Sequence, residues 1–504
     1  MYRVLAGMLL GCAVGSGATL AATFRFADQG DALSMDPHSL NESLQLNVTG
    51  NMYEPLVGRG KKLELVPLLA TSWKQTAPTV WRFIFSYQRS KDDGSDMKTK
   101  IASVKEVRKI DDYTVEFVTN DPFPILPDTI STWYMMSKTW CEKNNGMTPV
   151  DVRKGKENGT TLHANGTGPF MLKSREPGIR TVMVTYPGYW GGKIEGNVTE
   201  AIFTPIKNDA TRVAALVSGE IDMMEPVPLQ DIDKLKSNPE TVVLQGPELR
   251  TIFLGMDQSR DELLFSSVKG KNPFKDKRVR QAFYQAIDEA AIAKTIMRGA
   301  ATPSGLMIAP GIRGFPADLY PRLPYDPAAA KKLLAEAGYP NGFEVGMNCP
   351  NDRYVNDASI CQAVAAMLAK VDIKVNLMAE TKVNYFPKIL ARNTSFYMLG
   401  WTPDSYDAQN AIYALMTTPA PGGAGLFNLG TYSNKRVDEL GAQIASELDE
   451  TKRNAMIHEL FKIHQDDIGH IPLHQQALAW VTRNNIQLVQ LADNNNWLKW
   501  IIVK

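Results

Sequence analysis

Four side chains that could hold a charged, flat ligand lie within seven positions of the sequence. They follow an apolar run at 396–399 and are Trp401, Asp404, Tyr406 and Asp407. A carboxylate between aromatic rings suits a cationic group, because the acid pairs the charge while the rings add cation–π attraction and exclude water. The alternative is an ordinary polar loop. We expect the carboxylate of Asp404, stiffened by the preceding proline, to bind a ligand ammonium group.

A second candidate residue follows another predicted strand, at 343–347. Arg353, in "CPNDRY" (349–354), could bind a carboxylate through two parallel hydrogen bonds. An acid at one end and an arginine at the other would form a pocket for a zwitterion. Each residue alone could be a surface charge, whereas the two together favour a binding site.

The elements that must position these loops alternate between helix and strand. The segment "YDPAAAKKLLAEAGYPNGFEVGM" predicts a helix that is capped by Asp326 and ends at Gly338, before the 343–347 strand. The segment "DASICQAVAAMLAK" predicts an amphipathic helix, and "VDIKVNLMAE" a strand. Such alternation indicates an α/β architecture, in which ligands bind beyond the carboxyl ends of the strands.

Length and charge narrow the class of protein. A chain of 504 residues is too long for one core and indicates two or three domains. Its 55 basic residues balance 54 acidic ones, and no basic stripe is present, which excludes nucleic acid as a partner. No segment has the composition of a flexible tether, so we expect lobes that are connected by crossing strands.

The N-terminus has the layout of an export signal. The segment "MYRVLAGMLLGCAVGSGATLAATF" holds one positive charge, an apolar stretch and then small residues, which predicts a signal peptide over 1–22. A membrane anchor is the alternative, and a lipid anchor on Cys12 of "LLGC" is a third possibility. We favour an exported, soluble periplasmic protein.

The sequence gives little support for catalysis or metal binding. The late histidines, at 458, 464, 470 and 474, do not share one helical face, and no nucleophile motif or phosphate-binding glycine loop is present. We therefore predict a protein that is not an enzyme and that needs no cofactor or metal. Cys349 and Cys361 could form a disulfide in an oxidising compartment. A metal pair or two free thiols are the alternatives.

Many segments, in their shared order, resemble the substrate-binding proteins of ABC importers, in family 5, the peptide and nickel class. They span residue 23 to the end and include "NMYEPLV" (51–57), "NGTGPFMLKSREPG" (165–178), "GEIDMMEPVPLQDI" (219–232), "NPFKDKRVRQAFYQAID" (272–288), "LGWTPDSYDAQN" (399–410) and "IPLHQQ" (471–476). The resemblance implies a bilobal periplasmic-binding-protein fold of two mixed α/β lobes joined by a hinge. Lobe I would comprise 23–255, with an inserted subdomain at about 51–165, and the returning tail 471–504. Lobe II would comprise 256–470.

The resemblance also implies a function and a set of roles. The protein would be a monomer that binds a di- or oligopeptide between its lobes and delivers it to a membrane permease with a separate ATPase. Asp404 would bind the α-ammonium group and Arg353 a carboxylate, while Trp401 would line the pocket. A nickel chelate, an opine-like compound or a sugar are alternative ligands, and a secreted enzyme or chaperone-like binder is the alternative of another class.

One departure from the family pattern follows Phe83. A glycine-containing strand, a turn and the start of a helix are replaced by "IFSYQRSKDDGSDM" (84–97). We expect this loss to leave strand partners unpaired within the inserted subdomain.

Overall fold

The computed structural model describes residues 22–73, 80–81, 90–92, 94–111, 113–151 and 154–504. The predicted signal peptide, apart from Ala22, and the alternative lipid anchor at Cys12 lie outside the described residues. Half of the segment 84–97, which marks the predicted deletion after Phe83, also lies outside them, since 84–89 and 93 are not described. In the ranges above, no helix is long and apolar enough to cross a membrane.

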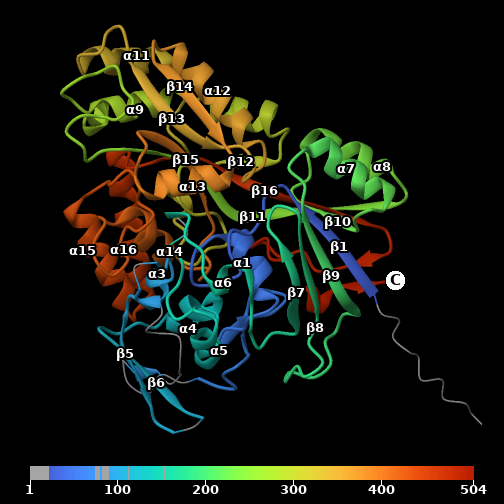
Figure 1. Cartoon of the computed structure of the whole chain (residues 1–504). Coiled ribbons are helices and arrows are strands. Elements are labelled where there is room, and N and C mark those ends of the chain that lie inside the picture. The colour runs from blue at the N-terminus through green and yellow to red at the C-terminus, as the bar shows by residue number, and fades with distance from the viewer. Residues whose placement is uncertain (1–21, 74–79, 82–89, 93, 112, 152–153) are drawn as a thin grey trace, which may run out of the picture.

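One mixed sheet runs through the whole molecule (Figure 1). Its strands, in spatial order, are β14 (Lys374–Glu380), β13 (Glu344–Pro350), β15 (Phe396–Trp401), β11 (Thr241–Met256), β16 (Ile471–Arg483), β10 (Met223–Met224), β1 (Ala22–Asp28), β9 (Val198–Pro205), β8 (Arg180–Thr185) and β7 (Phe170–Glu176), and β12 (Ala301–Pro303) also pairs with β16. β13 is parallel to β14 and β15, whereas β11 is antiparallel to β15 and β16. The long strands β11 and β16 therefore connect the two ends of the sheet.

Helices lie beside this sheet in two places. Figure 1 shows one group at the β13–β14 end and another beside β1 and β10. They are α9 (Lys277–Ala286), α11 (Pro327–Glu336) and α12 (Asp357–Ala369) in the first group, and α7 (Asp209–Ser218) and α8 (Ile232–Ser237) in the second. The α/β class predicted from the sequence is confirmed.

The predicted inserted subdomain is built from short elements, in the lower part of Figure 1. They are β2 (Val57–Arg59), β3 (Leu65–Pro67), β4 (Val80–Trp81), α3 (Lys98–Ile101), β5 (Val104–Lys109), β6 (Val115–Thr119), α4 (Leu126–Thr129), α5 (Lys138–Lys143) and α6 (Gly159–Leu162). The helix α1 (Ser43–Gly50) precedes them in the sequence. β2 pairs with β3, and β6 lies between β4 and β5.

A short helix, α10 (Glu289–Ala291), follows α9. Further helices follow β14 and β15 in the sequence, and a small strand pair lies near the C-terminus. They are α13 (Lys382–Leu390), α14 (Ala408–Ala411), α15 (Lys435–Ser446) and α16 (Glu450–Asp467), and the pair is β17 (Ile486–Gln487) with β18 (Ile502–Val503). α15 and α16 lie side by side at the left of Figure 1.

Local capping explains where α11 begins and ends. The Asp326 side chain accepts a hydrogen bond from the backbone N–H of Ala329 at 2.8 Å, and Pro327 is the first helical residue. The chain leaves the helix through Gly338, whose φ of 92° favours glycine. The predicted helix and its two limits are confirmed to within two residues.

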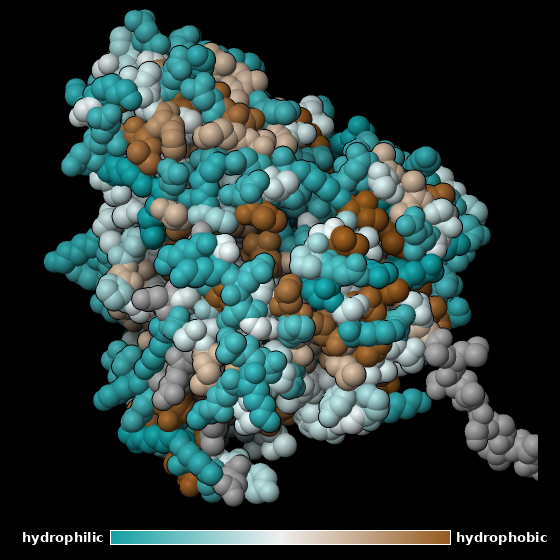
Figure 2. Space-filling model, viewed as in Figure 1, coloured by the Kyte–Doolittle hydropathy of each residue, from teal (hydrophilic) through white to brown (hydrophobic). Residues whose placement is uncertain are grey.

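The C-terminal tail completes the core of the N-terminal segments. Trp480 and Leu498 are fully buried in one hydrophobic cluster with Phe24 of β1 and Phe203 of β9. Most of the face in Figure 2 is hydrophilic, with hydrophobic residues gathered over the β7–β9 end of the sheet. β16 and the tail that follows it therefore belong to the same core as β1 and β9.

Candidate functional site

Four of the five predicted ligand-binding residues line one cavity. They are Arg353, Trp401, Asp404 and Tyr406. Further lining residues come from the start of α1, from Thr132 and Tyr134, from α13 and from the C-terminal tail at Asp493. The cavity encloses about 70 Å³, room for roughly five waters at 10–15 Å³ each. A ligand as large as a dipeptide therefore requires the surrounding segments to move apart.

The end of β15 fixes the aromatic wall. Trp401 is the last residue of this strand and lies opposite Thr251 of β11. Its indole N–H donates to Oδ1 of Asn410 at 2.8 Å, and its ring centroid lies 4.9 Å from that of Phe427. The ring is thus held in one orientation beside the cavity.

Asp404 has a partner that the sequence did not indicate. Its Oδ2 accepts from the ammonium group of Lys100, in α3, and from the Thr132 hydroxyl at 2.9 Å. Its Oδ1 accepts from the side-chain amide of Asn410 at 2.9 Å. A ligand ammonium group would therefore have to displace a protein cation. No local pattern marks Lys100, because a lysine becomes buried only through tertiary packing.

Tyr406 lines the cavity but is also fully engaged. Its hydroxyl donates to Oδ2 of Asp493 at 2.5 Å, and the guanidinium of Arg59 lies 4.6 Å from its ring centroid. Burial raises the pKa of both Tyr406 and Asp493. From the sequence we expected a ligand cation beside this ring, whereas in the structure Arg59 of the protein occupies that position.

Asp407 does not line the cavity. It is fully buried, caps α14 and forms ion pairs with Arg313 at 2.7 Å and with Arg453 at 2.6 Å. The predicted ligand contact is thus replaced by two arginines that are distant in the sequence. We assign this carboxylate a structural role.

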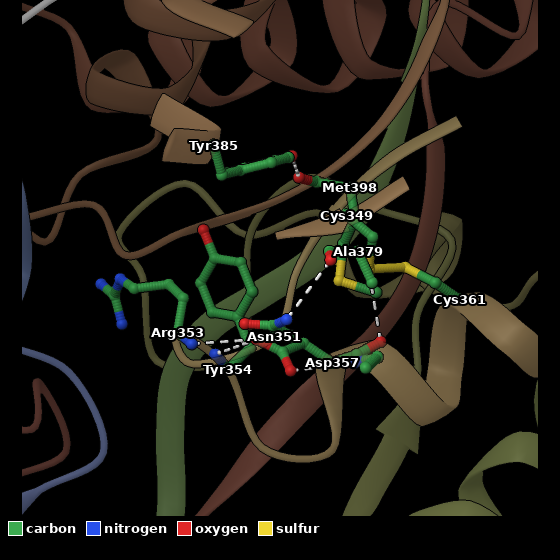
Figure 3. The surroundings of a disulfide bond; sticks show 10 residues. Cys349, Asn351, Arg353, Tyr354, Asp357, Cys361, Ala379, Tyr385 and Met398 are labelled. Carbon is green, nitrogen blue, oxygen red and sulfur yellow. Dashed lines mark hydrogen bonds between the residues drawn. A yellow bond between two sulfur atoms is a disulfide. The ribbon is translucent and has the colours of Figure 1, made fainter. Parts of the chain in front are cut away.

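The loop that carries Arg353 is fixed at both ends (Figure 3). A disulfide joins Cys349 in β13 to Cys361 in α12. Oδ2 of Asp357 accepts from the backbone N–H groups of Arg353 and Tyr354 at 2.9 and 3.0 Å. The Arg353 side chain extends away from the disulfide.

A buried carboxylate lies between Arg353 and a lysine. Oε1 of Glu42 is 2.7 Å from Nε of Arg353, and its Oε2 is 3.4 Å from Nζ of Lys382. Within the described part of the chain no acceptor is aligned with the Nε–H of Arg353, so the contact is an ion pair rather than a directed hydrogen bond. The carboxylates of Asp28 and Asp352 also interact electrostatically with both cations.

The charges also determine the ionisation of Glu42. Burial would raise its pKa, but the cations of Lys382 and Arg353, with the backbone N–H groups of Gln45 and Leu44, lower it to about 2. Glu42 is therefore ionised at neutral pH and cannot be neutralised to make room for a ligand.

The late histidines bond within the protein. Nε2 of His464 lies 2.9 Å from Nδ1 of His470, and Nδ1 of His474 lies 2.6 Å from Glu289. Among the residues that the structure describes, no group of three or more histidine, cysteine or acidic side chains is placed to hold a metal ion.

Comparison with known proteins defines the class. Residues 77–422 match the family described as bacterial extracellular solute-binding proteins, family 5 Middle. The chain belongs to this family.

Individual relatives and solved structures agree with this assignment. The chain is 25% identical to the glutathione-binding protein GsiB of Shigella flexneri serotype 5b, over 93% of this chain and 90% of that protein. Its fold matches DppA from Helicobacter pylori in complex with the peptide STSA, with a TM-score of 0.84, 22% identity and coverage of 96% and 98%. It also matches AgaA from A. tumefaciens R10 in complex with agropinic acid, with a TM-score of 0.83, 18% identity and coverage of 96% and 99%. The predicted bilobal fold and family are confirmed.

Proposed function

We propose that this protein is the receptor of an ABC importer that binds a peptide or peptide-like solute in the Arg353–Asp404 cavity. It would then deliver the solute to a membrane permease that is driven by a separate ATPase. Family membership supports the receptor role, and the similarity to a glutathione-binding protein supports a small peptide as the class of ligand. The receptor would act as a monomer in the periplasm, without catalysis.

The placement of Arg353 carries the proposal. The side chain is buried at the wall of the cavity, on a loop that a disulfide and Asp357 hold in place. A rigid guanidinium that faces a cavity is suited to a ligand carboxylate, which it can bind with two parallel hydrogen bonds. Peptides carry such a group at their carboxyl end.

The contacts across the cavity support binding between two lobes. We propose 23–255 with 471–504 as lobe I and 256–470 as lobe II. Pairs that cross between them at the cavity are Glu42–Arg353, Lys100–Asp404 and Asp493–Tyr406. Opening would break these pairs and enlarge the cavity, and closure would enclose the ligand.

A thermal-shift panel on the chain from Thr23 tests the proposal. The panel holds di- and tripeptides, glutathione, N-acetylated peptides, nickel with histidine, opine-like acids and oligosaccharides. A ligand at a hundred times its dissociation constant should stabilise the protein by about 2.7 kcal/mol. Arg353→Met should abolish the shift, whereas Arg436→Met, at a half-exposed arginine of α15, should retain it. A shift with nickel complexes or sugars alone would contradict a peptide-like ligand.

A further inference from the structure

The carboxylate at one end of the cavity, that of Asp404, is already largely engaged by the protein. Two donors, Lys100 and Thr132, share Oδ2 of Asp404, and Asn410 donates to Oδ1. A carboxylate offers about four acceptor positions, so three donors leave little capacity for a ligand. The ammonium group of Lys100 thus occupies the place that the amino end of a free peptide would need.

Lys100 has no alternative site for its charge within the described residues. Its side chain is 1% exposed, and Asp404 is its acidic partner. The neighbouring charge of Arg59 is repulsive toward it. Burial lowers the pKa of Lys100, and the charge of Asp404 opposes this shift. A ligand that displaced Lys100 from Asp404 would remove the interaction that keeps this buried ammonium group charged, which is costly. The lysine is therefore a fixed part of the site.

The opposite end of the cavity, at Arg353, presents a cation rather than a carboxylate to a ligand. Arg353 lies at the wall of the cavity, and its Nε–H has no aligned acceptor among the described residues, so the guanidinium can still donate to a ligand. This end favours an anionic group. An amine at the Asp404 end would meet Lys100, while a neutral amide or acyl group would not be repelled.

We propose that Lys100 acts as a built-in cation that excludes free amines, so that the ligand is a peptide-like acid whose amino end is blocked, such as an N-acylated peptide. The inference rests on the proposed function and narrows its substrate class. The expected ligand is then an anion whose amino end is neutral, and not the zwitterion expected from the sequence. Lys100 is thus a residue that determines specificity.

Three matched dipeptide libraries test this directly. One is unmodified, one is N-acetylated and one is N-acetylated and amidated at the carboxyl end. Thermal shift identifies binders, and calorimetry gives dissociation constants for the same sequence in each form. The wild-type chain should bind the acetylated form at least tenfold more tightly than the free form. Amidation of the carboxyl end should weaken binding at least tenfold.

Two variants separate this role from a structural one. Lys100→Met frees Asp404 and should reverse the preference toward free amines. The double variant Lys100→Met with Asp404→Asn leaves neither charge and should prefer the acetylated form again. A merely structural lysine would change stability without reversing the order of the two ligands. If the single variant does not fold, the wild-type preference and the double variant decide.

The outcomes distinguish the two proposals. A wild-type preference for free peptides, or an unchanged preference in Lys100→Met, overturns this inference and leaves the proposed function standing. If neither wild type nor variants bind any library, the peptide-receptor proposal fails and this inference fails with it.

Discussion

Glu42 and Arg353 form a buried ion pair across the cavity, with 2.7 Å between Oε1 and Nε. Glu42 begins α1 in the N-terminal part of the chain, and Arg353 follows β13, so the pair joins segments that meet only through the fold. Since Lys382 approaches the same carboxylate, removal of Glu42 would leave two buried cations without the carboxylate that they contact.

We predict that Glu42→Gln lowers the free energy of unfolding at pH 7 by about 3–5 kcal/mol. The pKa of Glu42 is near 4.5 in an unfolded chain and about 2 in the fold. Its contribution is therefore complete above pH 4.5 and is lost as the pH falls toward 2, by up to about 1.4 kcal/mol per pH unit. Urea unfolding at pH 7, 5, 4 and 3 should show the two proteins converging. A constant difference across this range would contradict the prediction.

Ligand affinity should depend on the shape of Arg353 and not only on its charge. Arg353→Lys keeps the charge but removes the planar fork, so binding of a carboxylate ligand should weaken at least tenfold. Arg436→Lys on α15 is the matched control, because this side chain is half exposed and pairs with Glu459 at the surface. Calorimetry with the strongest ligand of the panel measures both. Equal losses in the two variants would argue against Arg353 as a ligand residue.

Asp407 should matter for stability and not for binding. Asp407→Asn leaves the buried guanidinium of Arg453 without its counter-ion and weakens the cap of α14, which should cost about 3–5 kcal/mol in unfolding free energy. Asp466→Asn, at an exposed pair with Lys462 on α16, should cost less than about 0.5 kcal/mol. Below the melting temperature, ligand affinity of both variants should stay within threefold of wild type. A larger loss of ligand affinity in Asp407→Asn would show that Asp407 contributes to ligand binding.

The Cys349–Cys361 disulfide should stabilise the fold and the Arg353 loop together. The two cysteines are 12 positions apart, and a loop of that size corresponds to about 3 kcal/mol in the chain-entropy model. The double variant Cys349→Ala with Cys361→Ala should lose about this much unfolding free energy and also some ligand affinity. Reductant should destabilise the wild type and leave the variant unchanged, as urea titrations would show. Equal responses to reductant would mean that the disulfide is not formed.

The sequence predicted those helix limits and strands that are set by residues close together in the chain. The cap at Asp326 and the left-handed Gly338 set the limits of α11, and the apolar runs of β13 and β15 led to Arg353 and Trp401 at their carboxyl ends. The shared cavity followed from the rule that loops at one edge of a sheet lie together.

The two nearby carboxylates could not be told apart in this way. Asp404 and Asp407 have similar local surroundings in the sequence, but one lines the cavity and the other does not. The partners that separate them are Lys100 for the first and Arg313 and Arg453 for the second. These partners reach the loop only through tertiary contacts, and hence no pattern of spacing reveals them.

The antiparallel pairing of β16 with β10 and β11 sets an order of events during biosynthesis. Phe24 and Phe203 emerge early from the ribosome, yet Trp480 and Leu498, which close their core, are among the last residues made. At 5–20 residues per second, the early segments wait roughly 15–95 s for these partners. We therefore expect the N-terminal half to remain incompletely folded until the chain is finished. In a protein destined for export, such a state would suit passage through a narrow translocation channel, while its uncovered core residues would favour aggregation.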